Sequence, residues 1–85
     1  MGSYRLLTKP SATKEIEVIP KKDRLPVVKR IQGLSENPRP PGCEKLSGEK
    51  KYRLRQGWYR IVYSIDDQSR EVLVVKVGHR KDVYR

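Results

Sequence analysis

Hydrophobic and polar residues alternate along the second half of the chain, and this alternation predicts strands. Residues 58–65 give the clearest example, with one face formed by Tyr59, Ile61, Tyr63 and Ile65. Residues 52–55 predict a shorter strand before Gln56-Gly57, which we expect to form the hairpin turn. Residues 71–77 are almost wholly apolar and follow a turn at residues 66–69, so they predict a central strand covered on both sides.

The first half of the chain predicts a strand followed by a helix. Residues 4–9 form the strand, and Pro10 ends it. Ser11 is a suitable cap for a helix that begins at Ala12, because its hydroxyl can accept a hydrogen bond from the first helical turn. One face of that helix carries, at helical spacing, Ala12, Ile16 and Ile19.

A second helix is predicted over residues 23–36, after a break at residues 20–22. Its apolar stripe consists of Val27, Val28, Ile31 and Leu34. Pro26 is acceptable only in the first turn, so the helix should start near Asp23. The short break between the two helices indicates an antiparallel helical hairpin. Residues 36–50 contain three prolines and two glycines and predict a connecting loop.

These elements follow the order β-α-α-β-β-β, which predicts an α+β domain within the broad α/β class. We expect an antiparallel-rich sheet packed against the N-terminal helical hairpin. At 85 residues, of which 35% are apolar, residues 1–85 should form one small domain with one modest core.

Three arginines are predicted to share the sheet face that points away from the helices. Because Leu54 and Ile61 must be buried, the period of two places Arg53, Arg55 and Arg60 together on the opposite face. A turn at Gln56-Gly57 would put Arg53 directly opposite Arg60, which is unfavourable by a few tenths of a kcal/mol up to about 1 kcal/mol. Surface arginines paired with carboxylates such as Glu49 are the structural alternative.

The net charge of +10 favours a polyanionic partner, because 20 basic residues face only 10 acidic ones. Solubility alone is the simpler explanation of such a charge. Nucleic acid or an acidic protein is the more specific one. Planar guanidinium groups bind phosphate through two parallel hydrogen bonds, so the arginine face is a candidate phosphate-binding surface.

Single copies of the soft metal ligands limit other functions. Cys43 is the only cysteine and His79 the only histidine, which argues against an internal disulfide and a structural zinc site. We expect no cofactor and metal-independent chemistry. The chain has neither a secretory signal nor an apolar run long enough to cross a membrane, so we expect a cytoplasmic protein without membrane contact.

The C-terminal run VGHRKDVYR adds candidate chemistry to the cationic face. Gly78 is expected to end the last strand, which puts His79 and Arg80 at a strand end with Tyr84 close behind. RNA cleavage without a metal needs a base for the 2′-hydroxyl, cations for the crowded phosphorane and an acid for the leaving oxygen. Histidine and tyrosine exchange protons, whereas arginine scarcely does. Expected RNA contacts are Lys51, Lys81, Arg85 and the stacking platform Trp58.

In combination and order, four motifs resemble the RelE/ParE superfamily of bacterial toxins, and its RelE branch most closely. They are NPRPPG, KLSG, YRLRQGWYRIVY and VVKVGHRKDVYR. The resemblance, which covers almost the whole chain, implies a RelE-like fold. It also implies a type II toxin that cleaves mRNA in the 30S A site of the ribosome and is held inactive by a cognate antitoxin. The cationic face suggests that this antitoxin is acidic.

The resemblance also assigns roles to single residues. Arg53 and Arg55 match a basic pair that is lysine in RelE, and Arg60 matches a phosphate-binding arginine. Arg80 matches the basic residue after the last strand, and Tyr84 the tyrosine that stacks on the substrate base. The chain departs from the pattern at Ser47, where RelE has another arginine. From these matches we expect Arg53, Arg55, Arg60, Arg80 and Tyr84 to form the catalytic set. We add His79 as a hypothesis of our own, because histidine exchanges protons and arginine scarcely does.

Because Arg53 and Arg55 stand where RelE has lysines, the sequence does not identify the group that accepts the proton. Either the ribosome and substrate supply it, or His79 or Tyr84 does. Two other functions also stay open on the same fold. One is a ParE-like protein that binds DNA gyrase, and the other is a non-catalytic RNA-binding module or decayed toxin, which the departure at Ser47 slightly favours.

Overall fold

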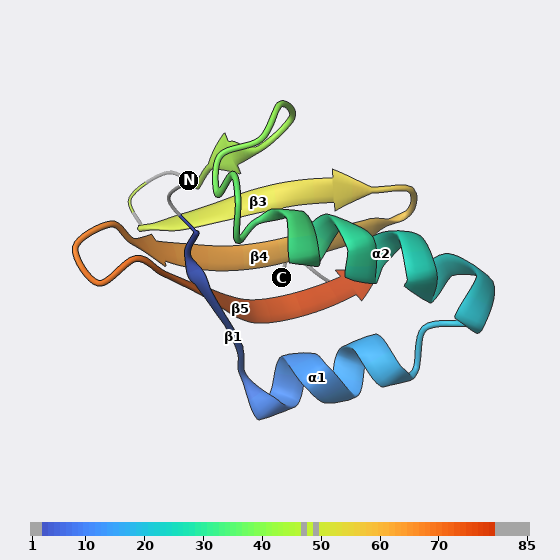
Figure 1. The fold of residues 1–85 in the computed structure, drawn as a ribbon. Coiled ribbons are helices and arrows are strands. Elements are labelled where there is room, and N and C mark those ends of the chain that lie inside the picture. The colour runs from blue at the N-terminus through green and yellow to red at the C-terminus, as the bar shows by residue number, and fades with distance from the viewer. Residues whose placement is uncertain (1–2, 47, 49, 80–85) are drawn as a thin grey trace.

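In the computed structural model, which describes residues 3–46, 48 and 50–79, a five-stranded sheet runs through the molecule (Figure 1). The strands are β1 (Arg5–Thr8), β2 (Glu44–Lys45), β3 (Lys51–Gln56), β4 (Tyr59–Asp66) and β5 (Glu71–His79). Their spatial order is β1-β5-β4-β3-β2. β1 pairs with β5 in parallel, and the other pairs are antiparallel, as the prediction of an antiparallel-rich sheet required.

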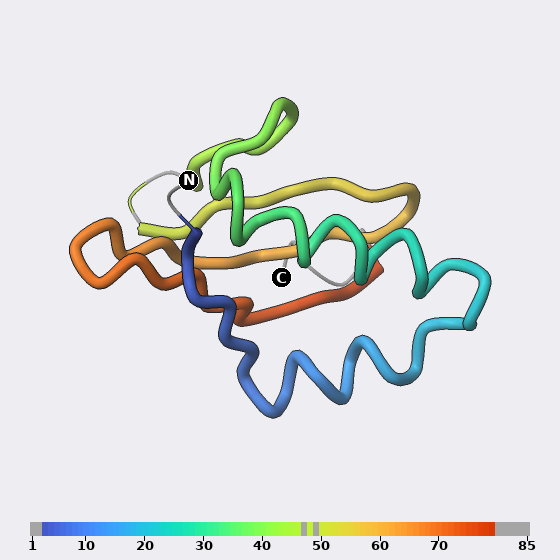
Figure 2. The backbone as a smooth tube through the Cα atoms, in the orientation of Figure 1, coloured from blue at the N-terminus to red at the C-terminus, as the bar shows by residue number. Residues whose placement is uncertain are grey.

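Two helices cover one face of the sheet, α1 (Pro10–Glu17) and α2 (Lys21–Gly33). The tube in Figure 2 follows the chain from β1 into α1, round a short connection and back along α2, so the helices run in opposite directions. This is the helical hairpin that the sequence predicted. The α+β fold class is therefore confirmed, with β2 as an additional short strand.

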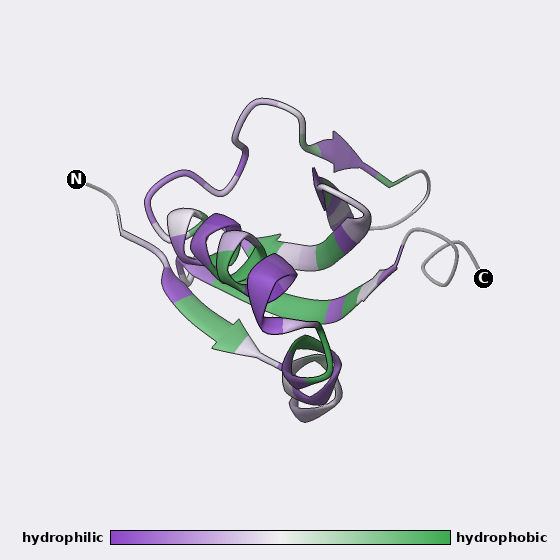
Figure 3. Ribbon diagram, turned by 90° about the vertical axis from the view of Figure 1, so that its right-hand side faces the viewer, coloured by the Kyte–Doolittle hydropathy of each residue, from purple (hydrophilic) through white to green (hydrophobic). Residues whose placement is uncertain are grey.

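The core lies between the helices and the sheet. Figure 3 shows hydrophobic residues along the central strands, whereas β2 is hydrophilic. The helices contribute to this core Ala12, Val27 and Ile31, and the segments that follow them contribute Ile19 and Leu34. The sheet contributes Leu54, Ile61, Tyr63, Val72, Val74 and Val77. Each fully buried aliphatic side chain contributes roughly 1.5–3 kcal/mol to folding. The buried face of β3 and β4 is therefore the one that alternation predicted, and the arginines occupy the other face.

Both helices begin earlier than predicted. α1 starts at Pro10 rather than Ala12, and Lys9, not Ser11, is the residue before its first turn. Proline is favourable there, because its missing N–H would have no partner in a first turn. α2 starts at Lys21 and ends at Gly33, so Pro26 lies inside the helix rather than in its first turn. Burial of Val27 and Ile31 against the sheet outweighs the hydrogen bond that this proline removes.

The turn between β3 and β4 is one residue later than predicted. The central residues are Gly57 and Trp58, and Gln56 pairs with Tyr59. Gly57 has a φ of +59°, as the first central position of a type II′ turn requires. The predicted pairing of Arg53 with Arg60 is therefore wrong.

β5 continues beyond its predicted end. Gly78 does not end the strand but pairs with Arg60, and His79 pairs with Tyr59. A register shift occurs on the way, because Val62 lies opposite Lys76 and Tyr63 opposite Val74. Glu15 on α1 stabilises this bulge, since its carboxylate accepts hydrogen bonds from the Val77 N–H at 2.9 Å and from Lys76 Nζ at 2.9 Å.

Candidate functional site

The structure brings Arg53, Arg55 and Arg60 together on one face of the β3–β4 hairpin. Arg55 lies directly opposite Arg60, and Arg53 lies opposite Val62. Directly opposite residues of an antiparallel pair share a face, so these guanidinium groups project away from buried Leu54 and Ile61. The like-charge pair expected from the sequence exists, but it is Arg55 with Arg60.

Burial differs strongly among the three arginines. Arg60 is only 4% exposed, the side chain of Arg53 is 18% exposed, and Arg55 is exposed. Withdrawing a guanidinium from water is expensive unless anionic or polar groups surround it. The face is therefore a recessed cationic site rather than a row of solvated side chains.

Glu44 on β2 is the carboxylate that accompanies these arginines. It lies opposite Arg53 in the β2–β3 ladder, and its Oε1 accepts a hydrogen bond from Arg53 Nη2 within an ion pair. The hydrogen bond from Arg53, and then the charges of Arg53, Arg55 and Arg60, lower the pKa of Glu44 below its ordinary value. Sequence reasoning missed Glu44, because a two-residue strand leaves no period to detect.

Two cavities flank Arg55. One, of about 260 Å³, is lined by Arg55, Gly57, Trp58 and Arg60. The other, of about 320 Å³, is lined by Arg30, Gly42, Glu44, Arg53 and Arg55. Arg30 comes from α2, and the sequence offered no signal for its role, since it occupies an ordinary polar position of an amphipathic helix. Arg55 is the one described residue that lines both cavities.

Trp58 is 61% exposed at the hairpin turn, which suits a stacking platform. The His79 ring stacks on it, with ring centroids 6.3 Å apart and an interplanar angle of 9°. His79 also meets the Tyr59 ring edge-on at 5.9 Å. Trp58 thus connects the arginine cavity with the histidine.

His79 itself lines a different cavity from the arginines. That cavity, of about 240 Å³, lies between α1 and the end of β5, and Glu15, Val18 and Lys76 also line it. His79 lies opposite Tyr59, one position along from the pair of Gly78 with Arg60, so its side chain belongs to the other sheet face. Trp58 stacks on His79 and also lines the cavity of Arg55 and Arg60.

The remaining candidates divide into two groups. Lys51 lies opposite Ser64 and shares the face of Arg53 and Arg55. The other candidates lie outside the described residues, namely Arg80, Lys81, Tyr84 and Arg85, and so do Ser47 and Glu49. Their predicted roles stay predictions.

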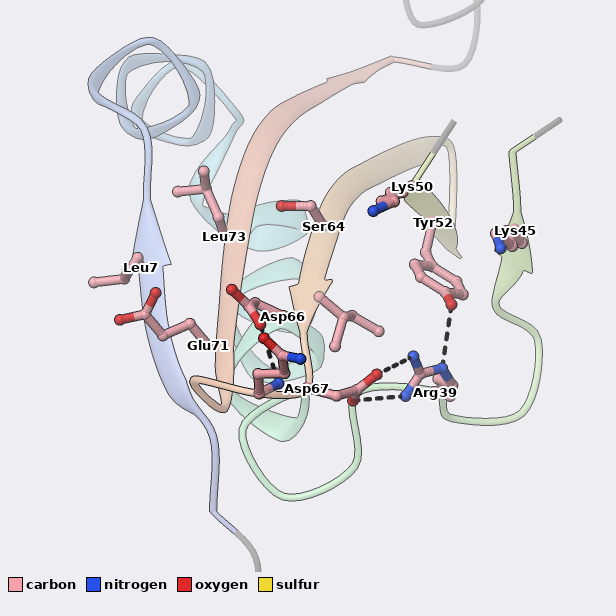
Figure 4. Close-up of a pocket in the computed structure, with 12 residues that line it drawn as sticks. Leu7, Arg39, Lys45, Lys50, Tyr52, Ser64, Asp66, Asp67, Glu71 and Leu73 are labelled. Carbon is pink, nitrogen blue, oxygen red and sulfur yellow. Dashed lines mark hydrogen bonds and ion pairs between the residues drawn. The ribbon is translucent and has the colours of Figure 1, made fainter. Parts of the chain in front are cut away.

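A further cavity, of about 770 Å³, lies at the other end of the β3–β4 ladder (Figure 4). Arg39 donates hydrogen bonds there to both carboxylate oxygens of Asp67, at 3.2 and 2.9 Å, and to the Tyr52 hydroxyl at 3.2 Å. The Tyr4 hydroxyl donates to the same Asp67 at 2.7 Å. The bonds from Arg39 and then Tyr4 lower the pKa of Asp67. Arg39 thus connects its own loop to β3, through Tyr52, and to the turn after β4, through Asp67.

Two further observations concern metal binding and membrane-spanning helices. Within residues 3–46, 48 and 50–79, no three histidine, cysteine or acidic side chains lie where they could share a metal ion. Neither described helix has the length and apolar character needed to cross a membrane.

Comparison with known proteins identifies relatives over most of the chain. A family model described as the ParE toxin of the type II toxin–antitoxin system parDE matches residues 6–84. An Escherichia coli protein described as RelE-like is 33% identical over 86 residues, covering 95% of this chain and 90% of that protein. Toxin RelG of Mycobacterium tuberculosis is 44% identical over 34 residues, which are 40% of this chain and only 39% of RelG.

A solved structure shares the fold at a similar level of identity. It is the intact E. coli RelBE toxin–antitoxin complex, in which the matched chain is 31% identical with a TM-score of 0.77. The match covers 91% of this chain and 96% of that chain. The sheet and the helical hairpin thus correspond as a whole, not as isolated motifs.

Proposed function

The chain belongs to the ParE toxin family of type II toxin–antitoxin systems, in the RelE-like branch of the RelE/ParE superfamily, and from this we propose that it is a ribosome-dependent endoribonuclease. Its substrate is mRNA in the A site of the small ribosomal subunit, and its effect is to stop translation. The observation that carries this proposal is the convergence of Arg53, Arg55 and Arg60 on one recessed face.

The chemistry is an attack of the RNA 2′-hydroxyl on the adjacent phosphorus. The 2′-oxygen loses its proton to a base and bonds to phosphorus, and the bond to the 5′-oxygen breaks as that oxygen takes up a proton. Negative charge grows on the phosphorane between these events. Arg60 and Arg55, opposite each other on β4 and β3, supply fixed positive charge for it. A buried arginine suits this task, because low local polarity strengthens its attraction for phosphate.

The Trp58 ring provides the stacking surface for a base next to the bound phosphate. Arg55, Arg60 and Trp58 line one cavity, so a nucleotide there meets two cations and an aromatic face together. Lys51 extends the positive face along β3. We assign Arg80, Lys81, Tyr84 and Arg85 to the same RNA contact from the family resemblance.

His79 is the proposed proton-transfer group of the described residues, and its stacking on Trp58 supports this. Arginines exchange protons poorly, so some other group must act. Single-turnover cleavage by His79→Ala should be slowed, with the loss concentrated on one limb of the pH–rate profile. Unchanged cleavage would remove His79 from the chemistry and leave Tyr84 or the ribosome as proton acceptor.

An acidic antitoxin is the proposed protein partner. The E. coli chain with a similar structure comes from the RelBE toxin–antitoxin complex. This chain carries a net charge of +10. Complementary charge on the partner would accelerate association and make binding sensitive to salt. The cytoplasm, where ribosomes and antitoxin are both available, is the proposed location.

Inhibition of DNA gyrase is the second candidate function, because the matching family model is named for ParE. Induced expression in a bacterial host separates the candidates. Ribonuclease activity predicts growth arrest with mRNA cuts at codon-defined positions, whereas gyrase inhibition predicts double-strand DNA breaks. Normal growth in the presence of folded protein would contradict both and favour a non-catalytic RNA-binding module.

The decisive test of the main proposal uses purified components. The 3′ ends of an mRNA are mapped on ribosomes programmed with a defined A-site codon, with and without the protein. We expect cuts confined to the A-site codon and no cuts in free mRNA. Equal cutting of free and ribosome-bound mRNA would disprove ribosome dependence, and no cutting would disprove the nuclease.

A further inference from the structure

We propose that the cavity between α2 and β3 is a second phosphate-binding site, formed by Arg30, Arg53 and Arg55. In the absence of RNA, the carboxylate of Glu44 occupies the place of the phosphate. The natural ligand is a phosphate of the RNA strand next to the one at Arg60, so this inference rests on the proposed function. No sequence motif or family resemblance pointed to Arg30 or Glu44.

Arg30 provides the first argument. It lies on α2, whose neighbouring residues Val27 and Ile31 are in the core, yet its guanidinium reaches the cavity that Arg53 and Arg55 line. Its Nε is buried and has no hydrogen-bond partner among the residues described. A buried donor left unsatisfied is costly, and an oxyanion in the cavity would remove that cost.

The charge balance of the cavity provides the second argument. Three guanidinium groups and one carboxylate line it, so the lining carries a formal surplus of two positive charges. Like charges brought so close favour an anion between them. A phosphodiester of an RNA strand brings one negative charge and several acceptor oxygens, so it can accept hydrogen bonds from more than one of these guanidinium groups.

Glu44 provides the third argument, because it behaves as an internal anion. Its ion pair with Arg53 keeps that guanidinium oriented towards the cavity. The Glu44 side chain is 63% exposed and belongs to a two-residue strand, so it can leave Arg53 with little loss of packing. Phosphate binding then exchanges one anion for another and leaves no buried charge unpaired.

Gly42 shapes the rim of the cavity. Its φ of +92° is a backbone conformation that favours glycine. A Cβ atom at this position would lie 4.0 Å from Arg30 Nη2, so the glycine backbone lies beside the guanidinium. The loop thus passes close to Arg30 without a side chain that would fill the space for a phosphate.

Arg55 connects this site to the first one. It lines both the cavity of Arg30 and Arg53 and the cavity of Trp58 and Arg60. Neighbouring cavities that share one guanidinium suit successive phosphates of one strand. A strand bound across both would have its base at Trp58 and its next phosphate at Arg30.

The experiment is a titration of the ¹⁵N-labelled protein with inorganic phosphate, followed through the Nε–H signals of the arginines. We expect the Arg30 signal to shift and saturate. Arg30→Gln should raise the half-saturating phosphate concentration about tenfold, the effect of losing one charge-assisted contact. The matched control Lys29→Gln removes the same charge from the neighbouring exposed position and should change it less than about twofold.

Glu44→Gln tests the proposed role of the carboxylate. Removing the competing anion should lower the half-saturating phosphate concentration about threefold. Dispersion of the amide signals in the same spectra shows whether each variant is folded. An Arg30 signal that does not respond to phosphate, or equal binding by Arg30→Gln and Lys29→Gln, would overturn the site. Unchanged or weaker binding by Glu44→Gln would overturn the role of Glu44.

A second measurement connects the site to RNA. On programmed ribosomes, Arg30→Gln should raise the half-saturating protein concentration for cleavage more than it lowers the maximal rate, relative to Lys29→Gln. A lower maximal rate alone would contradict a binding role. The phosphate titration involves no ribosome and no cleavage, so its result stands even if the wild-type protein cleaves nothing and the proposed function fails.

Discussion

The two ends of the β3–β4 ladder use arginine in opposite ways. At the end near Asp67, Arg39 donates three hydrogen bonds to Asp67 and Tyr52, and its guanidinium lies over the Tyr52 ring, 5.2 Å from the centroid. At the hairpin end, several guanidinium groups surround the single carboxylate of Glu44 in the cavity that it lines. The first end has matched charges, and the second has a surplus.

This difference distinguishes an arginine that connects parts of the fold from arginines that line cavities with excess positive charge. Arg39 has its hydrogen-bonding capacity directed at groups within the fold, so a phosphate would have to break contacts to reach it. Arg53, Arg55 and Arg60 lie on a face that the helices leave uncovered, with cavities beside them. Net charge alone does not separate the two cases, because it counts all arginines equally.

The largest expected effect is on the cleavage rate, when replacement of Arg60 at the hairpin end is compared with replacement of Arg39 at the other end. Arg60→Ala should slow single-turnover cleavage on programmed ribosomes by about 30- to 1,000-fold, since losing a fixed charge at the transition state costs about 2–4 kcal/mol. Arg39→Ala should leave cleavage nearly unchanged and lower the free energy of unfolding by about 1 kcal/mol or less. Because Arg60 is buried, chemical denaturation must show that its variant is folded at the assay temperature. Comparable slowing by both variants would abolish the distinction.

Trp58 should matter next, and only at the hairpin end. Trp58→Ala should weaken RNA binding by about 1–3 kcal/mol, the usual value of a base stacked on an aromatic ring. Trp58→Phe should recover most of this. Because the side chain is 61% exposed, stability should change by no more than about 0.5 kcal/mol. Equal loss in the alanine and phenylalanine variants would show that stacking is not its role.

Tyr63 tests the comparison at the Arg39 end of the ladder. Its ring stacks there on Tyr52, with ring centroids 5.8 Å apart. Its buried hydroxyl donates to the Pro38 carbonyl at 2.7 Å. Tyr63→Phe leaves that carbonyl unsatisfied and should lower the free energy of unfolding by about 1–2 kcal/mol, measured by urea denaturation. Cleavage should stay at the wild-type rate. A slower rate with unchanged stability would assign this end to function.

The smallest expected effect is a pH dependence at Asp67. Its pKa is lowered in the folded protein, so its contribution to stability is present above the unfolded pKa of about 3.9 and is lost as pH falls through the folded value. The stability difference between wild type and Asp67→Asn should be constant near neutral pH and disappear in strong acid. A difference that grows on acidification would have the wrong sign.

Prediction from sequence succeeded where one period governs many residues. The alternation of β4 set its buried face and thereby grouped the three arginines, whatever the register. Prediction failed for the turn position and for the end of β5, because a single glycine decides each of them. The turn moved by one residue because Gly57, not Gln56, takes the first central position, and β5 extended because Gly78 still pairs with Arg60.

The candidate site divides in the same way. Arg53, Arg55, Arg60 and Trp58 followed from strand periodicity, although Trp58 lies in the turn rather than in the strand. Arg30 and Glu44 could not, because they come from a helix and from a two-residue strand that approach β3 only after the chain has folded. Their role depends on distances across the molecule, and no local pattern encodes those.

The sequence by itself determined the fold class, the family and the face that carries the cations, because all three depend on patterns repeated along the chain. Only the tertiary structure decided that Arg39 faces an acidic partner while positive charge is in excess around the cavity of Glu44. Electrostatic pairing falls off steeply with distance and depends on burial. Arg39 and Arg60 are the same residue type in the sequence, and the position of Asp67, Glu44 and the sheet around them makes one a structural contact and the other a proposed ligand for phosphate.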